Sequence, residues 1–543
     1  MTVTDLRTNF AAVRPGLARL LAAAMLVAGL FLAAAPHARA ESIAFKQAVA
    51  EAAYRDDALS QFYRERGYEP LWTGRSDGAR RRALLEALSH AADHGLPASR
   101  YDAEQLAAGF RAARSARERG QVEVVASGMF LQYAQDVQAG VLQPNRVDDG
   151  IKRRAPRRDR LAQIVAFSKS TPDAYMRSLP PQSPEYARLM AAKQRLERLL
   201  GQGGWGPAVN ASVLRPGDSG PGVVALRNRL IAMGYMKRSA ASDYDAALQQ
   251  AVQAFQIDHG LASDGVAGDS TLSQINIPVE TRLEQVIVAM ERERWLGADR
   301  GKRHVLVNIT DFHASIIDDG KVTFETRSVV GMNAHDRRTP EFSDMMDHMI
   351  LNPTWNVPRS IAVKEYLPKL QKNPNAVSYL KLLDQRGRTV PRDAVDFNEF
   401  TEKTFPFDIK QPPSRRNALG LVKFMFPNRY NIYLHDTPEK HLFARSNRAF
   451  SHGCIRLNDP FDFAYALLAR QESDPKAFFQ SVLATGRETR VDLRQPIPVH
   501  LIYRTAFTQA KGRIQFRRDV YGRDAEIFDA LRAAGVALRA VQG

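Results

Sequence analysis

The only cysteine of the sequence, Cys454, lies among residues that could activate a thiol. It belongs to the run Ser451-His452-Gly453-Cys454-Ile455-Arg456-Leu457, and Tyr433-Leu434-His435-Asp436 lies upstream of that run. A thiol attacks as its thiolate, which a neighbouring imidazole can produce by taking the proton. A glycine just before the cysteine lets backbone N–H groups approach a developing oxyanion. The pattern therefore predicts acyl transfer by a reactive cysteine.

Two other interpretations apply to the same residues. A cysteine taken alone is most often a small buried apolar residue without chemistry. His435, His452 and Cys454 could instead bind zinc, but a His-x-Cys pair without further spaced ligands makes a poor tetrahedral set. We expect no metal and no cofactor.

His435, a spacer and the sequence Ser-His-Gly-Cys ending at Cys454 resemble the signature of the L,D-transpeptidases, whose catalytic domain is of the YkuD type. The resemblance implies that Cys454 is the nucleophile and that His435 is the base, oriented by the backbone carbonyl of Asp436. It also implies an oxyanion hole of N–H groups around Gly453 and Cys454. His452 would help to shape the pocket, and the reverse assignment, with His452 as the base, stays open.

The resemblance also implies a substrate. A cysteine acyltransferase of this penicillin-insensitive type would attack a peptidoglycan tetrapeptide stem, release D-alanine and form 3-3 cross-links. Arg456 could pair with a substrate carboxylate or hold the loop by an ion pair, and Tyr433 and Ser451 are expected around the substrate. Water as acceptor would make an L,D-carboxypeptidase, and an outer-membrane protein is another candidate acceptor. A non-catalytic wall-binding scaffold is the alternative without chemistry.

The composition sets wider limits. A chain of 543 residues is long enough for two to four domains, and 44% hydrophobic with 25% charged residues is ordinary for a globular protein. The net charge of +17 favours association with polyanions such as acidic wall polymers. Because no RNP-like, zinc-finger or P-loop pattern is present, we expect no nucleic-acid partner. The expected partners are peptidoglycan stem peptides and glycan.

The N-terminus has the pattern of an export signal. Arg7, Arg14 and Arg19 precede an apolar run over residues 20–35, and Ala38-Arg39-Ala40 offers small residues for cleavage. We expect residues 1–40 to be a signal peptide, cleaved after Ala40, and the mature protein to lie in a periplasm without a transmembrane helix. The run is short for a bilayer span, although an uncleaved anchor is the alternative.

The remaining chain predicts a multidomain α+β protein. Amphipathic patterns over residues 41–210 predict a helical scaffold domain, and a further scaffold helix is expected over 279–300. Between them, residues 211–278 predict a three-helix unit that resembles a peptidoglycan-binding domain. Alternating strands from residue 301 to 543 predict a β-rich catalytic domain, with Asp319-Gly320 as a hairpin turn. A polar insertion at about 358–417 is expected to be a capping subdomain.

Overall fold

The computed structural model describes residues 40–297, 299–509 and 512–541, and it divides them into two compact units. The first unit runs to Ala92 and includes Ala98–Asp136 and Arg157–Pro180; the second comprises the other described residues. The predicted signal peptide lies outside the described residues except for its last position. Within the described ranges, no helix is long and apolar enough to cross a membrane.

The first unit is helical. Aspartates begin three of its helices: the side chains of Asp56, Asp102 and Asp159 accept hydrogen bonds from the backbone N–H three residues later. Its core stacks Trp72 on Phe167, with ring centroids 5.1 Å apart. Its helices are residues 40–53, α2 (Asp57–Glu65), α3 (Gly78–Ser89), η2 (Ala98–Arg100), α4 (Ala103–Ala112), α5 (Ala116–Ala139), α7 (Arg160–Ser168) and α8 (Pro172–Ser178).

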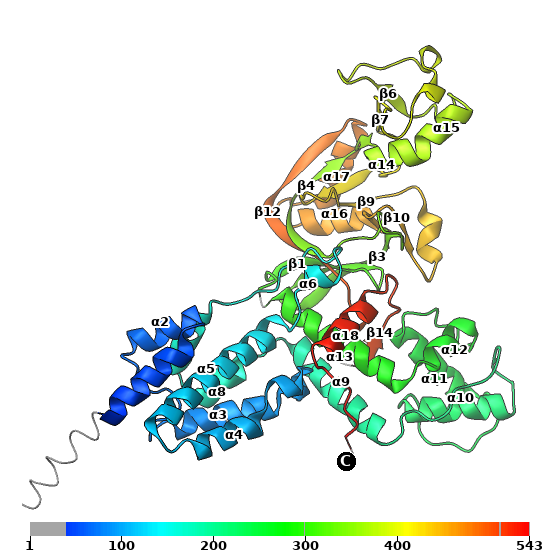
Figure 1. Cartoon of the computed structure of the whole chain (residues 1–543). Coiled ribbons are helices and arrows are strands. Elements are labelled where there is room, and N and C mark those ends of the chain that lie inside the picture. The colour runs from blue at the N-terminus through cyan, green and yellow to red at the C-terminus, as the bar shows by residue number, and fades with distance from the viewer. Residues whose placement is uncertain (1–39, 298, 510–511, 542–543) are drawn as a thin grey trace, which may run out of the picture. The chain divides into compact units, whose positions relative to one another are not determined.

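The second unit contains a three-helix module between two long helices that pack on each other. The module comprises α10 (Pro221–Ala232), α11 (Ala246–Asp258) and α12 (Asp269–Ile275), around a core that includes Leu226 and Phe255. The flanking helices α9 (Pro184–Gly201) and α13 (Val279–Leu296) lie side by side in Figure 1, and α13 also contacts α18 (Arg523–Ala533). The module is thus an insertion between α9 and α13. Short helices η1 (Ala91–His94) and α6 (Pro144–Val147) complete this part.

Buried ion pairs fasten α13 to the β-rich part of the same unit. The guanidinium of Arg292 lies 2.7 Å from Glu341 and 3.0 Å from Asp524. Because all three side chains are almost fully buried, loss of one partner would leave an uncompensated charge. The α13 helix therefore belongs structurally with the domain that follows it.

A nine-stranded sheet forms the body of that domain, in the order β10-β3-β11-β9-β8-β4-β12-β1-β2. Because β2 also pairs with β3, the pairings close into a ring. The Asp319-Gly320 turn has positive φ at both residues, 48° and 79°, and joins β2 to β3 as predicted. The strands are β1 (Arg303–Asn308), β2 (His313–Asp318), β3 (Lys321–Gly331), β4 (Phe342–Leu351), β8 (Val422–Met425), β9 (Leu434–His435), β10 (Ala449–Ser451), β11 (Ile455–Leu457) and β12 (Thr489–Ile502).

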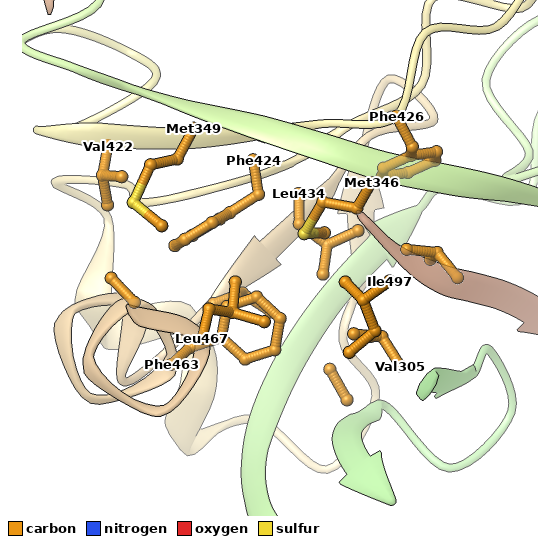
Figure 2. Packing of buried hydrophobic residues seen from close by; sticks show 14 of the residues in the cluster. Val305, Met346, Met349, Val422, Phe424, Phe426, Leu434, Phe463, Leu467 and Ile497 are labelled. Carbon is orange, nitrogen blue, oxygen red and sulfur yellow. The ribbon is translucent and has the colours of Figure 1, made fainter. Parts of the chain in front are cut away.

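The inner faces of these strands and one helix make the core. Figure 2 shows Phe463 and Leu467 packed toward Phe424 and Leu434, and all four are almost fully buried. The rings of Phe424 and Phe463 meet edge to face at 4.8 Å. The remaining elements are α16 (Pro460–Leu468), α17 (Pro475–Ala484), η6 (Lys440–Ala444), β13 (Ala506–Thr508) and β14 (Ile514–Phe516).

The insertion after residue 358 has a core of its own. Leu370, Phe397 and Ile409 are almost fully buried within it, so it is a small subdomain rather than a plain loop. We call residues 358–417 the cap insertion; Figure 1 shows its elements at one end of the sheet. They are α14 (Arg359–Ile361), η3 (Ala362–Tyr366), α15 (Leu367–Lys372), β6 (Lys381–Leu383), η4 (Arg392–Ala394), η5 (Phe397–Glu399) and β7 (Asp408–Gln411), which pairs with β5 (Trp355–Asn356). The predicted multidomain α+β class is confirmed.

Candidate active site

The pairing of strands β9 and β11 brings the segment of His435 beside the segment of Cys454. Parallel strands β9 and β11 set Leu434 opposite Ile455 and His435 opposite Arg456. Leu434 and Ile455 are fully buried in the core, so His435 and Arg456 lie on the other face. The Ile455 N–H donates to the Tyr433 carbonyl at 3.1 Å, which extends the pairing one residue back. The same alternation therefore carries Tyr433 and Cys454 to the face that holds His435.

Side-chain contacts join this group. Tyr433 lies near enough to the Cys454 thiol to influence its pKa, and the Tyr433 ring meets the His435 ring edge to face at 5.7 Å. The thiol also lies 3.5 Å from the Asn431 carbonyl. Antiparallel pairing of β8 with β9 sets Lys423 opposite His435, and its ammonium is 5.9 Å from the Tyr433 ring. Neither Lys423 nor Asn431 was predicted as a site residue.

Burial dominates the proton affinities of the thiol and the imidazole. It raises the pKa of the Cys454 thiol to about 11, although hydrogen bonds with Tyr433 and the charges of Arg456 and Lys423 oppose the shift. Burial also lowers the pKa of His435 to about 3, and the positive charge of Arg456 adds to that. Both groups are therefore neutral at neutral pH.

The orientation of His435 is fixed by its neighbour. Its Nδ1 lies 2.5 Å from the Asp436 carbonyl, which can only accept, so Nδ1 carries a proton, and the Leu419 carbonyl is a second backbone acceptor beside the ring. The Asp436 carboxylate accepts from the Leu421 N–H at 2.9 Å and from Lys440 at 2.9 Å. Gly420 has φ +61°, and a Cβ there would lie 2.3 Å from this carboxylate. Only glycine fits this position.

The loop before Cys454 is held by its own hydrogen bonds. The Ser451 hydroxyl donates to the Cys454 carbonyl at 2.5 Å and accepts from the Gly453 N–H at 3.1 Å. Gly453 has φ +113°, which a side chain would strain, and its carbonyl accepts from Thr339 at 2.7 Å. Among the described residues, the Cys454 N–H has no hydrogen-bond acceptor. Of the two backbone N–H groups predicted to bind the oxyanion, therefore, only the Cys454 N–H is without an acceptor among the described residues.

His452 contacts the cap insertion. Its Nε2 lies 2.5 Å from Glu365 Oε1, and Arg337 reaches the same oxygen at 2.8 Å. Next to it, Lys364 pairs with Asp336 at 2.7 Å. Nothing in the sequence near His452 signals Glu365, which comes from a separate element.

Arg456 is ion-paired with the half-exposed Glu439. No group of three or more His, Cys, Asp or Glu side chains able to hold a metal occurs in the part of the chain that the structure describes.

Comparisons with known proteins match the three parts of the chain separately. Residues 302–493 match the family model described as "L,D-transpeptidase catalytic domain", named YkuD. Residues 219–275 match "Putative peptidoglycan binding domain", and residues 57–192 match "Scaffold domain".

A curated Haemophilus influenzae protein named "Putative L,D-transpeptidase" is 31% identical over 272 residues, which cover 49% of this chain and 54% of that protein. The chain thus spans about half the length of this relative.

Among solved structures, an L,D-transpeptidase fragment from Xylanimonas cellulosilytica is 16% identical with a TM-score of 0.17, covering 55% of this chain and 100% of that one. An L,D-transpeptidase from Stackebrandtia nassauensis is also 16% identical, with a TM-score of 0.22, covering 55% and 97%. From the matches along its sequence, the chain carries an L,D-transpeptidase catalytic domain of the YkuD family, preceded by a scaffold domain and a peptidoglycan-binding domain.

Proposed function

We propose that the protein is an L,D-transpeptidase that cross-links peptidoglycan by acyl transfer through Cys454. The observation that carries this proposal is the β9–β11 register, which sets Cys454 and His435 on one face, with Tyr433 on the same face. The matched catalytic and peptidoglycan-binding domains support the same substrate. Such a substrate lies outside the cytoplasm, and we propose export to the periplasm by the N-terminal signal.

Attack would begin from neutral partners rather than from a preformed thiolate–imidazolium pair. With the pKa of Cys454 raised to about 11 and that of His435 lowered to about 3, the ion pair is disfavoured at rest. As the sulfur bonds to the carbonyl carbon before the terminal D-alanine, the thiol proton passes to Nε2 of His435. The Asp436 carbonyl keeps the imidazole oriented and stabilises its charge.

The tetrahedral intermediate needs a donor for its oxyanion. The Cys454 N–H is available, whereas the Gly453 N–H must first leave Ser451. The intermediate collapses when the C–N bond breaks and His435 gives its proton to the departing amine of D-alanine. A thioester at Cys454 remains.

The second half repeats these steps with a new nucleophile. The side-chain amine of a second stem attacks the thioester, His435 accepts its proton, and Cys454 leaves as the restored thiol. The product is a 3-3 cross-link. Water in place of the amine gives the carboxypeptidase reaction, and an amine of an outer-membrane protein gives its attachment to the wall.

The test is intact mass of the protein after incubation with a disaccharide-tetrapeptide, with product analysis alongside. We expect a thioester adduct on Cys454 that matches loss of D-alanine, together with dimeric muropeptide, and neither with Cys454→Ala. Trimmed monomer without dimer would favour the carboxypeptidase. No adduct on a folded protein would favour the non-catalytic scaffold.

His435→Gln separates the two candidate bases. General base catalysis contributes roughly 10²- to 10⁴-fold, so acylation should fall at least about a hundredfold. A smaller loss in His435→Gln than in His452→Gln would reverse the assignment.

A further inference from the structure

A basic cleft adjoins the loop that borders Cys454. It has a volume of about 630 Å³, and its wall includes Lys152, Arg153, Arg154 and Arg429. Arg429 belongs to the segment between β8 and β9, two residues before Asn431, whose carbonyl lies 3.5 Å from the Cys454 sulfur. The cleft and the thiol therefore share one short loop.

Among the described residues that line this cleft, the cations outnumber the carboxylates and form no ion pairs with them. Within the described ranges, none of these cations forms an ion pair with a carboxylate. Two carboxylates also line the cleft, but Asp299 accepts from the Gly301 N–H and Asp344 from the Met345 N–H. Most arginines around α13 form ion pairs with carboxylates, as Arg292 does. The four cations of the cleft differ from them in having no such pair among the described residues.

Arg153 is held in place at the wall of the cleft. Its guanidinium donates to the Ser343 hydroxyl at 2.7 Å and to the Leu501 carbonyl at 3.1 Å. Burial, together with the nearby charges of Arg504, Arg300 and Arg292, lowers the pKa of Arg153 to about 10, against the attraction of Glu341. The group is still charged at neutral pH, and an anion would stabilise that charge. The guanidinium thus offers a fixed positive charge to a ligand.

Tyr430 positions two of the other cations. Lys152 and Arg429 lie 5.9 Å and 5.1 Å from its ring centroid, and Phe342 meets the ring edge to face at 5.0 Å. Cation–π contacts of this kind restrict long side chains that would otherwise be mobile. His500 adds no charge, because burial lowers its pKa to about 4.

We propose that this cleft binds the carboxylates of a peptidoglycan stem peptide and holds the peptide beside the loop that borders Cys454. The proposal rests on the proposed function, since it takes its ligand from the same reaction. Planar guanidinium groups suit carboxylates bidentately, and a stem peptide carries several carboxylates in a short length. Phosphate shares this anion chemistry, so the test must separate the two.

The test measures binding, not turnover, in the full chain carrying Cys454→Ala. The probe is a sugar-free stem tetrapeptide, which removes glycan contacts with the peptidoglycan-binding module, and the readout is calorimetric affinity. The double variant R154Q/R429Q should bind about tenfold or more weakly, because two charge-assisted contacts are lost. The matched control R490Q/R532Q removes the same net charge from exposed arginines elsewhere and should bind as the parent does.

Equal affinities of R154Q/R429Q and R490Q/R532Q would overturn the proposal. So would a carboxamide form of the tetrapeptide that binds as tightly, or inorganic phosphate that displaces the peptide at a lower concentration. Acylation of the unmodified thiol is measured separately. If an adduct forms but binding does not depend on the cleft arginines, the proposed role of the cleft is refuted and the proposed chemistry is not. If binding depends on the cleft arginines but no adduct forms, the proposed chemistry is refuted and the role of the cleft is not.

Discussion

The thiol of Cys454 should react slowly with alkylating agents at neutral pH even though it is the proposed nucleophile. Its pKa of about 11 lies about four units above pH 7, so about 10⁻⁴ of the thiol is ionised. An ordinary cysteine of pKa about 8.5 is about 3% ionised at that pH. Because a more basic thiolate is also more nucleophilic by about tenfold over this difference in pKa, alkylation in the folded protein should be about 20- to 30-fold slower than in the unfolded chain, before any effect of restricted access.

The assay is the rate of iodoacetamide labelling between pH 6 and 10, followed by intact mass. The single cysteine makes the signal unambiguous, and the same protein in urea supplies the reference. We expect the folded-state rate to rise about tenfold per pH unit without a plateau, because the thiolate fraction rises in that proportion below the pKa. The rate in His435→Gln should follow the same slope.

A plateau below about pH 8, lost in His435→Gln, would refute this reasoning. It would mean that the imidazole already holds the thiol proton at rest, and the concerted attack proposed above would be wrong. Slow labelling, by contrast, would not indicate an inert wall-binding scaffold. Acylation by substrate, which brings its own carbonyl to the thiol, is the measurement that separates a buried nucleophile from an inert cysteine.

Two further substitutions test how the site is held. Gly420→Ala should destabilise the protein by about 1–3 kcal/mol in urea unfolding and lower acylation, because the new methyl group displaces the Asp436 carboxylate; unchanged stability would contradict the close approach. Glu365→Gln should raise hydrogen exchange in α14 and η3, because it weakens the contacts with His452 and Arg337; exchange equal to that of the Glu399→Gln control would contradict a holding role.

The order of elements was accessible from the sequence because it rests on local patterns. Alternation and the Asp-Gly turn predict the β2–β3 hairpin, and helical spacing predicts the three-helix module. The sequence also predicted that His435 would act on Cys454, which requires their segments to lie close together. Their pairing as parallel strands was not deduced, because parallel register depends on distant parts of the chain.

Proton affinities could not be predicted from residue types. Two histidines near a cysteine suggest a lowered thiol pKa, yet burial raises it, because a charged sulfur loses more solvation than its neighbours restore. Burial is a property of the packed fold, and the residues that cause it come from several elements. The sequence predicts which residues would react, whereas the fold determines whether they are charged at rest.

The cap insertion contacts two residues near Cys454, Tyr433 and His452. Tyr433 is packed against both the sheet core and the separate core of the insertion. Glu365 of the insertion contacts His452, two residues from the same thiol. The insertion therefore supports the site through Tyr433 and His452, which it contacts, rather than through the thiol itself.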